Sequence, residues 1–155
     1  MDKRIIIQLI VARLSKDLGA IAASAKAAHS EATHEQNKPE GKYDTRALEA
    51  SYLARSQSRQ VAELENAKQE YEALPPHDWL SDAPIDVGAL LTLEHGDGKT
   101  CYFLGPKAGG VEIVFEKTPV TVITPHSPIG RQLMGKKPGE AIDFRGESWR
   151  IVQVQ

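Results

Sequence analysis

The spacing of apolar residues divides this chain into two halves with different periodicities. In the first half, apolar residues recur in alternating steps of four and three, a heptad spacing that is typical of packed helices. The first run comprises Ile7, Val11, Leu14, Leu18, Ile21, Ala25, Ala28 and Ala32. A second run, which Gln57 interrupts, comprises Ala47, Ala50, Ala54, Val61, Leu64 and Tyr71. The pattern predicts two long helices, each with one apolar seam.

The two runs are separated by Asn-Lys-Pro-Glu-Gly at residues 37–41, a cluster that breaks helices. We therefore predict an antiparallel coiled-coil hairpin from about Ile5 to Leu74, with its turn between Thr33 and Asp44. Large residues of both runs fall at the base of this hairpin, and alanines of both runs fall near the turn. Small side chains let helices approach closely, so the grading predicts a hairpin that is thick at its base and slim at its tip.

The second half has the composition of strands and turns. Residues 1–74 contain one proline, and the other eight follow Leu74. Short apolar runs with turn signals between them predict strands at 87–94, 100–104, 111–115, 119–124, 140–145 and 149–154. The sequence Gly96-Asp97-Gly98 predicts a hairpin turn between the first two. We expect an α+β chain with a helical finger at 1–74, a linker at 75–84 and a small, mostly antiparallel β domain at 85–155.

One short helix is expected within the β domain. Ser127 can cap its first N–H groups, and Pro128 suits the first helical position. Ile129, Leu133 and Met134 would give it one apolar face. Gly135 is placed to end the helix, and a Pro-Gly turn at 138–139 leads into the next strand.

Composition excludes several classes of function. The formal net charge is −2, which provides no basic footprint for direct nucleic-acid binding. Cys101 is the single cysteine, so no internal disulfide can form, and its apolar neighbours predict a buried, inert thiol. No run approaches the ~20 apolar residues of a membrane span, and the apolar run near the N-terminus is too short for a secretory signal. We expect a soluble, cytoplasmic protein.

The stretch from Val120 to Ile142 resembles the C-terminal domain of the bacterial Gre transcription factors. Thr124–Ile142 fits that family's Ser-Pro turn, short helix ending in Gly-Lys, and Gly-acidic pair without a gap. The resemblance extends over nearly the whole chain, because Gre factors join an N-terminal coiled-coil finger to an FKBP-like C-terminal domain. It implies that the protein binds RNA polymerase and meets nucleic acid only through it. The finger would enter the secondary channel, and Ser127, Pro128 and Ile129 would contact the channel's rim.

The turn of the hairpin is where the resemblance places chemistry. In Gre factors, an acidic pair at the tip lends a second Mg²⁺ to the polymerase, which then cleaves backtracked RNA; the factor itself is not an enzyme. The candidate ligands here are Glu35, Glu40 and Asp44. The tip departs from the family pattern, since alignment on Tyr43 places Gln36 and Pro39 where the two carboxylates belong. Two mechanisms stay open: stimulation of cleavage, and occupation of the channel without cleavage.

Two other classes of protein would share part of this pattern. An FKBP-type prolyl isomerase with a helical chaperone arm needs a pocket lined by several aromatic residues. The aromatics of the second half instead alternate along strands, which suits a core. A coiled coil that dimerises through the hairpin is disfavoured by the break at 39–41, because a turn there favours closure within one chain. We therefore expect a monomer with no cofactor of its own.

Overall fold

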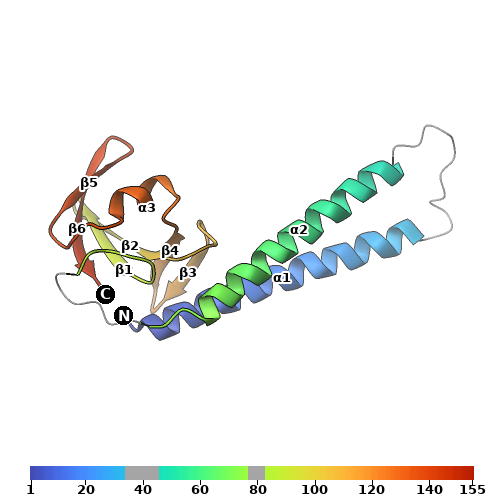
Figure 1. Cartoon of the computed structure of the whole chain (residues 1–155), viewed down its shortest axis with the longest axis horizontal. Coiled ribbons are helices and arrows are strands. Elements are labelled where there is room, and N and C mark those ends of the chain that lie inside the picture. The colour runs from blue at the N-terminus through green and yellow to red at the C-terminus, as the bar shows by residue number, and fades with distance from the viewer. Residues whose placement is uncertain (34–45, 77–82) are drawn as a thin grey trace. The chain divides into compact units, whose positions relative to one another are not determined.

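The computed structural model describes residues 1–33, 46–76 and 83–155, and it confirms the α+β class (Figure 1). Two long helices come first, α1 at Lys3–Thr33 and α2 at Arg46–Glu72. Six strands and one short helix follow: β1 Leu90–His95, β2 Gly98–Leu104, β3 Glu112–Phe115, β4 Thr118–Ile123, α3 Pro128–Leu133, β5 Ala141–Phe144 and β6 Glu147–Val154. Each predicted strand is present, and their bounds agree within a few residues.

The described part of the chain forms two compact units. One, the helical unit, is Leu14–Lys68. The other, the sheet unit, joins Met1–Arg13 to Gln69–Gln155. The first turns of α1 and the end of α2 therefore belong with the sheet. The predicted domain boundaries at residues 74 and 84 stay a prediction, because compactness alone does not define a unit that folds by itself.

Within the helical unit, α1 and α2 run in opposite directions, as predicted for a hairpin (Figure 1). Six residues at seam positions are half-buried, whereas most of their neighbours are exposed: Leu18, Ile21, Ala25, Gln57, Val61 and Leu64. The expected close packing of alanines near the turn is not observed at Ala54, which is exposed. The seam alanines beyond it lie outside the described side chains.

The base of α1 buries two residues that the predicted seam left out. Ile6 and Ile10 are completely buried, as is Leu14 of the predicted seam, whereas Ile7 and Val11 are only half-buried. The three consecutive isoleucines at 5–7 explain the error, because such a run is apolar on every side and its spacing cannot show which side is covered. Ile7 and Val11 instead line a cavity of about 330 Å³ together with Tyr71 and Leu74 of the same unit.

Gly19 provides a test of how far α1 depends on intrinsic helix propensity. The residue lies inside α1, and no atom would meet a Cβ added there. Because glycine is about 0.5–1 kcal/mol less favourable than alanine inside a helix, we expect Gly19→Ala to stabilise the helical unit by that amount. Thermal unfolding followed by helical circular dichroism at 222 nm measures this effect. An unchanged or lower midpoint would mean that α1 is not a regular, solvated helix at this point.

The six strands form one sheet in the order β3-β4-β2-β1-β6-β5. All neighbouring pairs are antiparallel except β2 and β4, which are parallel in the register Cys101 to Val120 and Leu104 to Ile123. The predicted β1–β2 hairpin is present, with Gly96 in the left-handed region at φ 55°. A break in register between Thr92 and Leu93 marks a bulge in the pairing of β1 with β6.

The two faces of the sheet are both buried. On one face, the strand pairing brings six buried residues of neighbouring strands side by side: Leu90, Cys101, Phe103, Ile113, Val120 and Val122. Tyr71 at the end of α2 covers Phe103 there, with 6.2 Å between ring centroids. The other face carries Leu91, Leu93, Ile142 and Ile151, which form a core cluster with residues of α3. The short helix thus lies on the sheet face opposite the one that Tyr71 covers.

Candidate functional site

Ser127 starts α3 as the sequence predicts. Its hydroxyl accepts a hydrogen bond from the N–H of Gly130 at 3.1 Å and donates one to the carbonyl of Thr124 at 2.7 Å. Pro128 follows in the first turn of the helix, where a missing N–H has no cost. The hydroxyl therefore makes both of its hydrogen bonds to backbone groups. In this structure Ser127 is the N-cap that holds the start of α3 in place.

Of the three predicted polymerase contacts, Ile129 is buried in the structure, and its role as a contact stays a prediction. Its side chain is 5% exposed and belongs to the core cluster with Leu133. Pro128 is exposed. Met134, which the sequence placed on the apolar face, is 37% exposed. The apolar side of this six-residue helix is so narrow that Ile129 and Leu133 fill it, and Met134 turns outward at the C-cap.

The end of α3 is held by Ile85, the buried residue that precedes β1. Gly135 N donates to Ile85 O at 2.8 Å, and Ile85 N donates to Lys136 O at 2.8 Å. Gly135 has a φ of 77°, so the chain turns there in a conformation that glycine adopts without strain. These bonds fix the segment after α3 as firmly as Ser127 fixes its start.

Glu140 organises the loop between α3 and β5. Its carboxylate accepts a hydrogen bond from Lys137 N at 2.6 Å and pairs with Lys136 Nζ at 3.2 Å. The backbone hydrogen bond from Lys137, with the help of the Lys136 ammonium, lowers the pKa of this exposed carboxyl below its ordinary value. Glu140 thus neutralises part of a basic segment.

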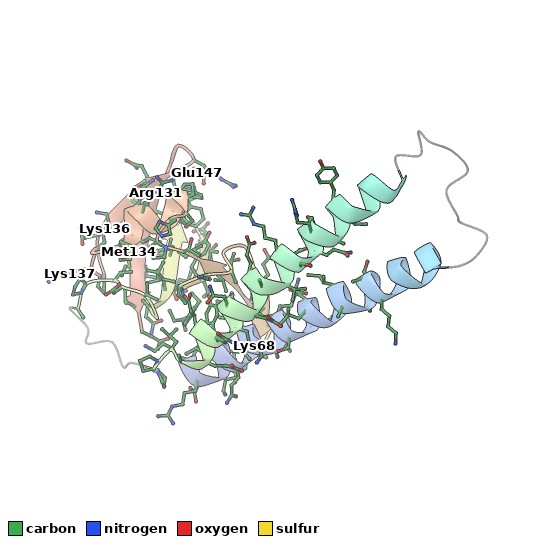
Figure 2. The ribbon with its side chains drawn as sticks, turned by 45° about the vertical axis from the view of Figure 1, so that its right-hand side comes forward. Lys68, Arg131, Met134, Lys136, Lys137 and Glu147 are labelled. Carbon is green, nitrogen blue, oxygen red and sulfur yellow. The ribbon has the colours of Figure 1, made fainter. Side chains whose placement is uncertain are left out.

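The exposed side of α3 carries positive charge and apolar surface together. Figure 2 shows Arg131 and Met134 at α3, with Lys136 and Lys137 on the segment that follows it. We call Pro128, Arg131 and Met134 the α3 outer face. These three residues are spaced by three, and each is exposed. Sequence reasoning missed Arg131, although its spacing from Pro128, opposite the buried Ile129 and Leu133, was a signal that could have found it.

The candidate tip ligands Glu35, Glu40 and Asp44 lie outside the described residues. In the part of the chain that is described, no group of three or more His, Cys, Asp and Glu side chains is placed to hold a metal ion. None of the helices described here is long and apolar enough to cross a membrane. Cys101 is buried, as predicted.

The aromatic residues of the sheet pack as core residues. Tyr102, Phe144 and Trp149 lie against the core cluster beneath α3. Trp149 also contacts the ring of His95, with 5.1 Å between centroids. One cavity of about 650 Å³ is lined by residues at 1–4 and 152–155 with Pro76 and Pro138, and another is the 330 Å³ cavity beside Tyr71. The three aromatic residues line neither of these two cavities.

Comparisons with known proteins give low similarity. No family model matches the chain, and no curated protein matches it. Among solved structures, the GreA factor homolog 1 (Gfh1) of Thermus thermophilus is 18% identical, with 94% of each chain covered and a TM-score of 0.37. Gfh1 of Thermus aquaticus is 18% identical, with 92% of each chain covered and a TM-score of 0.36. The prokaryotic transcription elongation factor GreA/GreB of Nitrosomonas europaea is 20% identical; 70% of this chain and 92% of that chain are covered, with a TM-score of 0.35.

Proposed function

We propose that this chain is a Gre-like transcription factor that binds RNA polymerase. The observation that carries the proposal is a combination of two features in one chain. An N-terminal pair of long helices precedes a sheet unit, and within that unit the Gre-like stretch from Thr124 to Ile142 folds as a Ser-Pro-capped helix, a glycine turn and a strand. The resemblance of this stretch supplies the partner, RNA polymerase.

The helical finger is proposed to enter the secondary channel of the polymerase, with the sheet unit, FKBP-like in this proposal, docked at its rim. Two mechanisms follow from the tip. In the first, Glu35, Glu40 or Asp44 completes the coordination of a Mg²⁺ ion that the polymerase's own carboxylates also hold. In the second, the finger occupies the channel and changes transcription without RNA cleavage. The second is retained because Gln36 and Pro39 stand where the family has its carboxylates.

Binding to core RNA polymerase, followed by RNA cleavage in a backtracked complex, tests the proposal. We expect the full chain to be retained by immobilised polymerase. If the first mechanism holds, Glu40→Ala or Asp44→Ala should reduce cleavage at least tenfold and leave retention unchanged, because a shared metal acts mainly in the transition state.

The two mechanisms give different results. If both variants cleave as well as the parent, Glu35 remains as the candidate ligand. If the parent stimulates no cleavage but alters transcript yield in a single-round assay, the second mechanism is supported. Failure of the parent to bind polymerase at all would refute the proposed function.

A further inference from the structure

Strand β3 is an edge of the sheet, and two of its residues direct their backbone hydrogen-bonding groups away from it. The strand order begins with β3, which pairs only with β4. Val122 N donates to Val111 O at 2.8 Å, so the carbonyl of Val111 faces β4. Because backbone groups alternate sides along an antiparallel strand, those of Glu112 and Val114 point outward. We call these outward groups the β3 edge. An edge of this kind is a template for pairing with another chain.

The side chain at the centre of the β3 edge favours such pairing. Val114 is 64% exposed, more than any other large apolar residue in the part of the chain that is described. Valine is β-branched and suits a pleated strand. The opposite edge, β5, is different: Ile151 N donates to Glu140 O, so the same alternation directs Ala141 and Asp143 outward. That edge therefore has a small residue and a charge, whereas the β3 edge has an exposed valine and needs protection from elsewhere.

Arg13 of α1 supplies one part of this protection. Its Nη1 donates a hydrogen bond to Glu112 O at 3.3 Å, and both residues belong to the sheet unit. The bond agrees with the outward direction of the Glu112 carbonyl, and it takes up the acceptor that an added strand would need. The guanidinium also places a charge at the edge, which is one of the ways in which natural sheets avoid pairing with other sheets.

Two exposed carboxylates supply the other part. A second copy of the chain would add its β3 in antiparallel orientation, so that outward residues face outward residues. If Glu112 faces Glu112 or Val114 of the second copy, the pairing needs the carbonyl that Arg13 holds. If Val114 faces Val114 of the second copy, Glu112 comes next to the second copy's Glu116, at the turn after β3, and this happens twice. Both carboxylates are exposed, and like charges placed opposite each other destabilise a strand pair.

We infer that Arg13, Glu112 and Glu116 protect the β3 edge and keep this chain from pairing with a second copy of itself. The inference concerns self-assembly and goes beyond the proposed function. It gives a second physical reason for the monomer that the sequence predicts, because the break at 39–41 opposes only dimerisation through the long helices. It also means that two substitutions should convert the monomer into a dimer.

The test removes the protection in the full chain with the double variant Arg13→Ala, Glu116→Lys. This variant frees Glu112 O and turns the repulsion between the two copies into attraction. The control is Arg55→Ala with Glu65→Lys, which changes the net charge by the same amount at exposed positions of the helical unit. Sedimentation velocity over a series of protein concentrations measures self-association. We expect the double variant to associate at least about tenfold more tightly than the parent, because two charge pairs change sign and two backbone acceptors are freed. The control should match the parent.

Two further variants separate pairing at β3 from other effects. Val114→Lys, added to the double variant, places like charges opposite each other and should return self-association to the level of the parent. Glu116→Lys alone leaves the Arg13 bond in place and should give an intermediate effect, even if loss of Arg13 were to disturb the fold. All variants should keep the circular dichroism spectrum of the parent, since the substituted side chains are exposed.

Three results would overturn the inference. The double variant and Glu116→Lys could both associate no more tightly than the parent or the control, so that these residues do not oppose pairing. The added Val114→Lys could leave the association of the double variant unchanged, so that the copies meet through another surface. The parent could itself be a dimer that Val114→Lys dissociates, so that the β3 edge is open. The proposed function stands in each case, because no measurement in this test involves the polymerase.

Discussion

Replacement of Tyr71 by alanine is expected to destabilise the sheet unit by about 3–5 kcal/mol, the usual cost of removing a buried aromatic side chain. Tyr71 is completely buried near the end of α2. Its ring lies against Phe103, and its hydroxyl donates a hydrogen bond to Lys107 O at 2.8 Å. The ring also approaches Gly105 so closely that only glycine fits there, since a Cβ on residue 105 would lie 2.8 Å from the Tyr71 ring carbon Cζ. Urea unfolding followed by near-ultraviolet circular dichroism measures the loss.

Tyr71→Phe separates the hydrogen bond from the packing. The ring remains and Lys107 O loses its donor, so we expect a cost of about 1–2 kcal/mol. A loss as large as that of Tyr71→Ala would show that the hydroxyl, rather than the ring, dominates this contact. No loss from either change would contradict the burial of α2's end in the sheet unit.

Comparison of the parent with Tyr71→Phe should also reveal a pH dependence of the free energy of unfolding. Burial, and secondarily the charge of Glu70, raises the pKa of Tyr71 well above its ordinary value of 10.0. The unfolded chain releases the tyrosine proton near pH 10, whereas the folded protein retains it. The stability that this group contributes is therefore complete below pH 10 and is lost as pH rises above 10. The parent should lose more free energy of unfolding between pH 9 and pH 11 than Tyr71→Phe, which has no proton to release at this site.

Gly130→Ala is the second change with a large expected effect, about 3 kcal/mol of destabilisation from overpacking. A Cβ at this position would collide with the carbonyl oxygen of Thr124 and lie 2.8 Å from Ser127 Oγ. Neither atom can move cheaply, because Thr124 O accepts hydrogen bonds from both Ser127 N and Ser127 Oγ. The gain in helix propensity from alanine, up to about 1 kcal/mol, is too small to compensate. Urea unfolding measures the change.

Gly98→Ala is the matched control for this prediction. A Cβ at Gly98 would meet only His95 O, at an ordinary contact distance of 3.5 Å. Its effect should stay within about 1 kcal/mol. If Gly130→Ala were as stable as Gly98→Ala, α3 would have to approach Thr124 less closely than the structure indicates.

Most of the fold could be predicted because its signals are local. Strand bounds, the β1–β2 turn and the start of α3 depend on residues a few positions apart, and all were found. The parallel pairing of β2 with β4 could not be predicted, since both strands have the alternation of any half-buried strand. Ile6 and Ile10 are completely buried in a unit whose other residues begin at Gln69, more than fifty positions later, and no pattern within the helix records that partner segment.

Which side chains α3 exposes could be predicted less well, for a physical reason. Ser127 and Pro128 were recognised by the positions that a helix start requires, and those positions are correct. Whether Ile129 or Met134 faces outward depends on how the six-residue helix rotates against the sheet. That rotation is set by Leu133 and by the bonds to Ile85, which lies far away in the sequence. Arg131 has no apolar character of its own, so the one signal for its exposure was its spacing from Pro128, opposite Ile129 and Leu133.

The composition of the sheet unit has a consequence for synthesis on the ribosome. Met1–Arg13 belong to a unit whose other residues begin at Gln69. The intervening stretch is about 55 residues long, so at ~5–20 residues per second the first turn of α1 waits about 3–11 s for the earliest of its partners. During that interval Ile6 and Ile10 lack the later residues of the unit in which they are buried. We therefore expect the nascent chain to recruit a chaperone at its isoleucine-rich start, and expression of residues 69–155 alone to yield an aggregating fragment.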